Sequence, residues 1–327
     1  MECNIKDRFL TKYKKFEMND NNYKQYNNQI TKLYNFVREK IVVDNEIELL
    51  KQIDGFLMEE FYYYIQDKKY RFNTVNTIII CLKDYFNYLC DIHVIEKNYA
   101  DVMKKYKPKE VNLDKKQKDT LTVNEMKKII ECSYIRKKGE RGFDFNSSRD
   151  RFLMALLFTT GLRISEALEI RLDWIENIEG VGIMINIPKE FVKNHMDKRV
   201  PLVSSIKRFY DEYITERNKI KLEDKKILFV TTNGKQYCSK NARESISKLV
   251  NKAKIEEKHI VPHSLRHSLT RQLISDRVDV HIIKKTLGWS EEDDIIGVYS
   301  GSASDKTYDE TKMSVCDLFK DIKFDIA

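Results

Sequence analysis

The chain has 327 residues, a length typical of two domains of ordinary size, and 42% of them are hydrophobic, which excludes a disordered chain. Its formal net charge of +8 reflects 59 basic and 51 acidic residues, an excess that permits a nucleic-acid partner without requiring one. No apolar run is long enough to cross a bilayer, so we expect no membrane span.

The cysteine pattern and the N-terminus both indicate a cytoplasmic protein. The first residues carry no apolar signal region. The six cysteines are scattered and never form a Cys-x-x-Cys pair, so we expect reduced thiols. They are Cys3, Cys81, Cys90, Cys132, Cys238 and Cys316.

Helical periodicity dominates the first hundred residues. Residues 1–20 are polar and predict a loose segment or a short helix. Longer helices are expected over residues 22–40, 46–66 and 75–89, the last with Thr74 as its cap. Because no strand pattern interrupts them, residues 1–103 are predicted to form a small helical bundle.

Residues 104–120 have the composition of a linker. They contain seven lysines and Pro108 and have no hydrophobic period. A solvated tether explains this composition, and so does a tether that follows a phosphate backbone.

A second domain is predicted from residue 121 to residue 327. It opens with a capping box from Thr122 to Glu125. Helices are expected over residues 149–160, 163–172, 204–218 and 239–253, the last capped by Ser239, and strands over 180–187, 198–202 and 227–230. A further helix is expected within residues 304–322. The expected fold class is mainly α with a small β-sheet.

Two motifs in this domain place arginines at helix starts. Gly161 is suited to end one helix in the left-handed region, and Arg163 then begins the next, with Glu166 one turn later. Farther on, Pro262 precedes a helix on which His263 and Arg266 share one face. A helix that begins in this way offers hydrogen-bond donors to an anion.

No convincing metal cluster accompanies these arginines. His263 and His267 lie four residues apart, but Ser264 occupies the position that carries glutamate in the His-Glu-x-x-His zinc pattern. Arginine keeps its charge and can bind two phosphate oxygens at once, so fixed cations can take the place of a metal.

The ordered motifs resemble the tyrosine recombinase (phage integrase) family, which includes the Xer recombinases and Cre. The residues that carry the resemblance lie between residues 121 and 300. They are Gly-Leu-Arg-Ile-Ser-Glu-Ala-Leu from Gly161, His-Ser-Leu-Arg-His from His263, Leu-Gly-Trp-Ser from Leu287, and then Tyr299. The resemblance implies an N-terminal core-binding bundle and a C-terminal catalytic domain of mixed α/β structure.

By this resemblance, Arg163 and Arg266 are the phosphate clamps. Glu166 matches the acidic residue that orients Arg163 or His263, and His263 binds the phosphate or accepts the proton of the nucleophile. Trp289 stands where most members have histidine and Cre-like members have tryptophan; its indole N–H can only donate.

Tyr299 is the expected nucleophile. The family forms a 3′-phosphotyrosyl link and releases a 5′-hydroxyl, without ATP, metal or other cofactor. Tyr299 lies one residue farther from Trp289 than is usual in the family, and Tyr308 is the rival.

A lysine between the two strands is expected to protonate the departing 5′-oxygen, because an alkoxide is a poor leaving group. Spacing from Pro201 in the family pattern favours Lys193. Lys189 is the rival, and Lys198 is expected to lie already in the second strand.

The resemblance also implies the partners. They are double-stranded DNA target sites, three further copies of the chain in a tetramer on two sites, and accessory DNA-bending proteins in some systems. The segment 304–327 is expected to dock into a neighbouring copy. Integration, excision, resolution and inversion all remain open. The alternatives are a DNA-binding protein of this fold without catalysis and a type IB topoisomerase.

Overall fold

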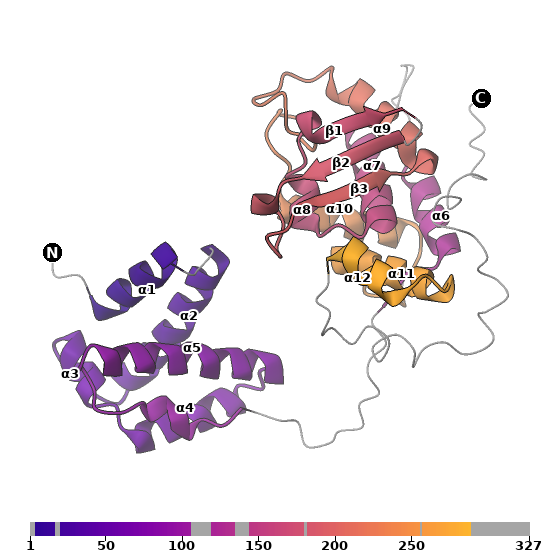
Figure 1. Ribbon diagram of the computed structural model, residues 1–327. Coiled ribbons are helices and arrows are strands. Elements are labelled where there is room, and N and C mark those ends of the chain that lie inside the picture. Colours follow the sequence, from indigo (N-terminus) through magenta and orange to yellow (C-terminus); the bar gives the residue numbers. More distant parts are fainter. Residues whose placement is uncertain are drawn as a thin grey trace. The chain divides into compact units, whose positions relative to one another are not determined.

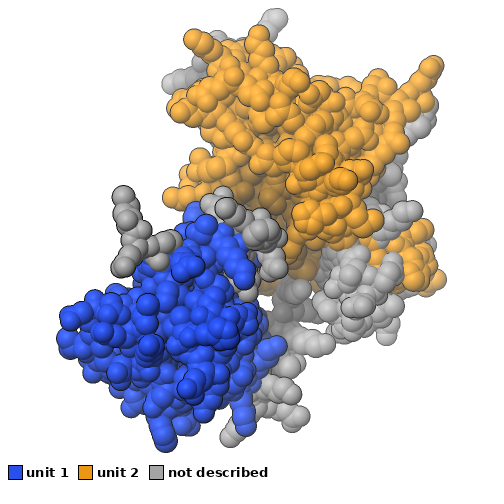
Figure 2. All heavy atoms as spheres, turned by 60° about the vertical axis from the view of Figure 1, so that its left-hand side comes forward, with its two compact units in different colours: residues 1–113 blue, residues 114–327 orange. Residues whose placement is uncertain are grey.

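The computed structural model describes residues 4–16, 20–105, 119–134, 144–179, 182–255 and 257–288 (Figure 1). The chain forms two compact units, residues 1–113 and residues 114–327, coloured separately in Figure 2. The described residues are mostly helical with one three-stranded sheet, so the expected fold class is confirmed. No described helix is both long and apolar enough to cross a membrane.

The first unit is a helical bundle. Its elements are α1 (Ile5–Phe16), α2 (Asp20–Arg38), α3 (Glu46–Lys51), α4 (Gly55–Asp67), α5 (Phe72–Asp91) and the 3-10 helix η1 (Tyr99–Val102). Glu46 connects three helices, because its carboxylate accepts hydrogen bonds from the Ile5 backbone N–H of α1 and, at 2.7 Å, from the Tyr34 hydroxyl of α2. Burial raises the pKa of the Tyr34 phenol, which stays protonated and can donate.

Two expectations for this unit were wrong. The single helix expected over 46–66 is two helices, because the Asp54 carboxylate accepts from the Leu57 N–H at 2.8 Å and starts α4 as its N-cap. The helix expected to begin after Thr74 begins at Phe72, with Arg71 as an N-cap that makes no side-chain capping bond.

The second unit contains the sheet. Its helices are α6 (Val123–Cys132), α7 (Phe145–Thr160), α8 (Ile164–Leu168), α9 (Ser204–Arg217), α10 (Ser239–Lys252), α11 (Pro262–Ser275) and α12 (Val280–Leu287), with 3-10 helices η2 (Leu172–Trp174) and η3 (Lys189–Phe191). The strands β1 (Ile175–Ile178), β2 (Gly182–Ile187) and β3 (Lys198–Leu202) pair antiparallel in that order. The capping box expected at Thr122 and Glu125 is confirmed.

Helix α7 is the centre of this unit. Nearly all of its side chains are buried, as expected for a helix surrounded by other elements. It packs against α9 on one side and α11 on another. The ring of Phe152 in α7 stacks on Phe229 at a centroid distance of 5.5 Å. Because α8 and α11 both pack against α7, this helix positions both of them.

The strand expected over 227–230 is not formed. Only single bridges join Ile227 to Arg171 and Val230 to Gln236. The buried Arg217 side chain donates to the carbonyls of Ile227 and, at 3.1 Å, Leu228, so a guanidinium takes acceptors that a neighbouring strand would use.

Two other expected elements differ in their bounds or caps, and one strand was not expected. The helix expected over 163–172 ends at Leu168. Strand β1, whose short Ile-Glu-Asn-Ile sequence has no apolar alternation, was not predicted. Helix α10 begins at Ser239 itself, after Cys238 as its N-cap.

The expected linker of residues 104–120 lies mostly outside the described residues. At its start, the Lys104 carbonyl accepts from the Tyr62 hydroxyl at 2.9 Å, which joins it to the first unit. At its end, the Thr120 carbonyl accepts from the Lys258 ammonium at 3.0 Å, which joins it to the second. The domain boundaries expected at 103 and 121 therefore stay predictions.

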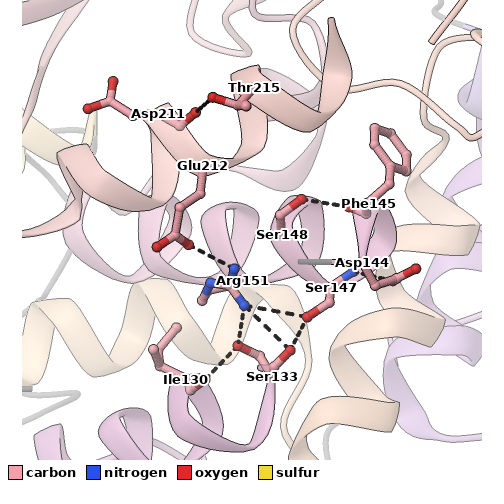
Figure 3. A network of polar contacts seen from close by, with 10 residues as sticks. All are labelled: Ile130, Ser133, Asp144, Phe145, Ser147, Ser148, Arg151, Asp211, Glu212 and Thr215. Carbon is pink, nitrogen blue, oxygen red and sulfur yellow. Dashed lines mark hydrogen bonds and ion pairs between the residues drawn. The ribbon is translucent and has the colours of Figure 1, made fainter. Parts of the chain in front are cut away.

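A buried cation links α7 to its neighbours (Figure 3). The Arg151 guanidinium forms an ion pair with Glu212 of α9 at 2.8 Å, and it donates to the Ser133 carbonyl at 3.5 Å and the Ser147 hydroxyl at 3.4 Å. It also lies over the Tyr134 ring at 3.7 Å. Arg151 is fully buried, so these partners must offset the cost of removing its charge from water.

We predict that Arg151→Met lowers the free energy of unfolding by about 3 kcal/mol, because removal of one partner leaves the others buried without a cation. Lys207→Met is the matched control, since it breaks the exposed Lys207–Asp211 pair. That control should cost less than about 1 kcal/mol. Urea unfolding measures both variants, and equal losses would contradict a structural role for the Arg151 network.

Candidate active site

Arg163 is placed by the turn that ends α7. Gly161 is the C-cap of that helix with φ of 62°, which confirms the expected left-handed stop, and its N–H donates to the Leu157 carbonyl at 3.0 Å. Arg163 is then the N-cap of α8. Its side chain is 24% exposed, so it is partly accessible to solvent.

Glu166 binds Arg163 twice. One carboxylate oxygen pairs with the Arg163 Nη1 at 2.7 Å, and the other accepts from the Arg163 backbone N–H at 3.1 Å. Glu166 is only 1% exposed, so it is not a solvated helix carboxylate. The same side chain therefore caps α8 and orients the guanidinium.

A third group, Lys198, completes this cluster. Its Nζ lies 3.2 Å from the Glu166 carboxylate oxygen, and its side chain is 9% exposed. Burial raises the pKa of Glu166, but Lys198 and Arg163 together bring it below its usual range. Burial lowers the pKa of Lys198, Glu166 opposes that shift, and the charges of Arg266 and Arg163 add to it, so the net pKa is lowered.

Arg266 joins the two helix-start motifs. Its Nη1 donates to the Gly161 carbonyl at 2.9 Å, two residues before Arg163, and its Nη2 donates to the Leu287 carbonyl at the end of α12. Arg266 is 1% exposed. In this conformation Arg266 contributes a buried positive charge, and its Nη1 and Nη2 donate to backbone carbonyls rather than to solvent.

His263 lies in the first turn of α11, three residues before Arg266, and is exposed. Its ring meets that of the buried His267 edge to face, with centroids 4.4 Å apart. The imidazole of His263 is thus exposed in the first turn of α11, one helical turn before the buried Arg266.

The connection between β2 and β3 approaches the end of α12. A Cβ placed on Gly288 would lie 3.0 Å from the Asn194 Nδ2, so the Asn194 side chain rests against Gly288. Lys193 precedes Asn194 and is exposed. Lys189 is exposed in η3, while Lys198 lies in β3 as expected. Among the three lysines, Lys193 is adjacent to the contact with α12.

Four segments far apart in the sequence therefore meet at Arg266 and Gly288. Trp289, Tyr299, the rival Tyr308 and the segment 304–327 lie outside the described residues. Among the described residues, no group of three or more His, Cys, Asp or Glu side chains could hold a metal ion. The described cluster has three cations and one carboxylate, which suits an anion.

The structure adds Lys198 to the cluster formed by Arg163, Glu166 and Arg266. The sequence carried a signal for it, because strand alternation puts Lys198 on the same face as the buried Val200 and Leu202. The contributions of the Gly161 and Leu287 carbonyls and of Asn194 had no such signal, since each depends on contacts between distant segments.

Comparison with known proteins places the chain in a family. Residues 119–305, more than half of the chain, match the phage integrase family, and the chain belongs to it. The tyrosine recombinase XerD of Staphylococcus saprophyticus is 29% identical over 184 residues. That alignment covers 54% of this chain and 56% of XerD, so the chain spans about half the length of this relative. XerD of Staphylococcus aureus gives 28% identity over 183 residues.

Solved structures share the fold. The XerH site-specific recombinase bound to a palindromic difH substrate aligns with a TM-score of 0.66 at 19% identity, over 88% of this chain and 78% of XerH. A lambda integrase fragment bound as a dimer to a COC′ core site aligns with a TM-score of 0.64 at 15% identity, over 91% of this chain and 95% of that one. At such identities the likeness is one of fold.

We predict that Gly161→Ala destabilises the second unit more than Gly182→Ala does. Both glycines have positive φ, 62° and 105°, so both substitutions strain the backbone. At Gly161 the new Cβ would also lie 2.4 Å from Leu287 Cδ2, whereas at Gly182 it meets no described atom within 4 Å. The difference in unfolding free energy should be about 1–3 kcal/mol.

Urea denaturation of the full chain measures this difference. Equal losses for the two variants would show that Leu287 moves aside freely and that the end of α12 is not fixed by the Gly161 turn.

Proposed function

We propose that the chain is a site-specific DNA recombinase that cuts and rejoins DNA through a 3′-phosphotyrosyl intermediate, with Tyr299 as nucleophile. One observation carries the proposal. Arg266 hydrogen-bonds the segment that leads to Arg163 and the segment that leads to Trp289, so one buried cation connects three motifs of the family. An arrangement for DNA binding alone does not call for this convergence.

The described side chains fit phosphoryl transfer by fixed charges. Arg163 presents its guanidinium at the surface and Arg266 supplies charge behind it, where the negative charge of the transition state develops. His263 donates to the phosphate or takes the tyrosine proton. Trp289 donates its indole N–H to a phosphate oxygen. Membership of the family supports these roles, and the reaction they describe uses neither ATP nor metal.

The proposed partners are double-stranded target sites and further copies of the chain. One of the similar solved structures is a lambda integrase tetramer bound to a Holliday junction. We propose the same assembly here, with segment 304–327 docking into a neighbouring copy and accessory DNA-bending proteins in some reactions. The first unit is proposed to bind the core site, in the cytoplasm of a bacterial cell, and a mobile element fits the role.

Tyr299→Phe should bind DNA as the wild type does but form no covalent adduct, because it lacks the hydroxyl that attacks phosphorus. The substrate is a duplex selected from a random pool by the full chain, nicked so that the cut fragment diffuses away. Adduct formation is read by denaturing gel electrophoresis in the presence of EDTA.

Tyr308→Phe is the matched control and should keep the adduct. If Tyr299→Phe keeps the adduct and Tyr308→Phe loses it, the nucleophile is Tyr308. If the wild type cuts only without EDTA, a metal takes part. A wild-type chain that binds the duplex and never forms an adduct is a DNA-binding protein.

Lys193→Ala should cut normal DNA slowly and recover on a substrate with sulfur at the 5′-bridging position. A thiolate leaves without a proton, so sulfur at the 5′-bridging position removes the need for a general acid. Arg163→Ala should lose about 10²-fold or more on both substrates, because its charge is needed for either leaving group.

The same two substrates distinguish the rival lysine. Recovery on sulfur by Lys189→Ala, together with a normal rate for Lys193→Ala, assigns the proton to Lys189. The position of Asn194 against Gly288 supports Lys193, since it places that end of the hairpin connection beside the segment that leads to Trp289.

A further inference from the structure

Lys198 is a buried cation in a strand. It begins β3, on the face that also buries Val200 and Leu202, and only 9% of it is exposed. A buried ammonium is costly unless it is paired and hydrogen-bonded. Its partner is the Glu166 carboxylate at 3.2 Å, on a helix start more than thirty residues earlier.

Glu166 divides its two oxygens between its partners. Oε1 binds the Arg163 guanidinium at 2.7 Å, while Oε2 binds Lys198 and, at 3.1 Å, the Arg163 backbone N–H. Glu166 and Arg163 alone form a neutral pair, which attracts a phosphate weakly. With Lys198 included, the carboxylate is shared between two cations and the group keeps net positive charge.

We propose that Lys198 is a positioning residue for the arginine clamp: it holds and neutralises Glu166 so that Arg163 is oriented and still available to a phosphate. This inference rests on the proposed recombinase function. It also separates the role of Lys198 from that of the hairpin lysines. The Lys198 ammonium is bound to Glu166, and the proposed proton donor is an exposed lysine of the hairpin connection, Lys193 or its rival Lys189.

The site predicts a change in pH dependence when Lys198 is removed. The charged groups that bear on Glu166 and Lys198 are Arg163 of α8 and Arg266 of α11. Lys198 lowers the pKa of Glu166, so its removal raises that pKa. Glu166 then gains a proton, and Arg163 loses its anchor, at a higher pH. The acid limb of the cleavage profile should move to higher pH.

The test compares Lys198→Met, Lys198→Arg and Arg199→Met in the full chain. Arg199 is the matched control, because it is the next residue of β3 and its side chain is 56% exposed on the other face. The probe is the selected, nicked duplex with oxygen or sulfur at the 5′-bridging position. Adduct formation is measured with saturating protein, so that the rate of cleavage is separated from DNA binding.

Lys198→Met should slow cleavage about 10–100-fold, by analogy with the residues that orient the ligands of metal sites. The loss should be equal on oxygen and sulfur substrates, with the acid limb moved to higher pH. Lys198→Arg should restore cleavage, because a guanidinium keeps the charge and can reach the carboxylate. Arg199→Met should cleave as the wild type does.

Three outcomes with the single variants overturn the inference. They are normal cleavage by Lys198→Met, recovery of Lys198→Met on sulfur, which makes Lys198 the general acid, and failure of Lys198→Arg to restore cleavage. If Lys198→Met does not fold, the double variant Glu166→Gln with Lys198→Met is used, because it removes both buried charges. That double variant should cleave at the rate of Glu166→Gln alone, and a slower rate overturns the inference. A wild type without any adduct refutes the proposed function itself, which is a separate result.

Discussion

The contact on which the active-site arrangement depends is that between the Arg266 guanidinium and two backbone carbonyls, those of Gly161 and Leu287. A fully buried cation must find acceptors, and charge-assisted hydrogen bonds are among the strongest available. Because the two acceptors end different helices, the same guanidinium fixes the end of α7 and the end of α12. The absence of a side chain at Gly161 leaves the space that the Leu287 side chain occupies.

Local signals in the sequence predicted the parts of this arrangement that are local in the fold. Gly161 ends α7 as expected, and Thr122 and Glu125 form the expected capping box, because each depends on neighbours within one turn. The division into a helical part and a mixed part followed from hydrophobic periods. The order of the arginine motifs indicated the family, and the match over residues 119–305 agrees with it.

The parts that could not be predicted depend on side chains that reach across the fold. The apolar run at 227–230 has the composition of a strand, but Arg217 donates to its carbonyls. Asp54 divides an expected helix because its carboxylate is a better cap than a helical residue. The sequence predicts that Lys198 lies in the second strand, and only its distance to Glu166 shows what it binds. Periodicity gives the direction of a side chain and not the identity of its partner.

The double use of Glu166 has a consequence for spectroscopy. One carboxylate holds the Arg163 guanidinium and also accepts from the Arg163 amide at the start of α8. Both bonds depend on the side-chain torsion angles of Glu166. A tilt of the carboxylate that follows the guanidinium therefore also changes the hydrogen bond to the Arg163 amide. The backbone nitrogen resonance of Arg163 is therefore an internal reporter of the charge state around its own side chain.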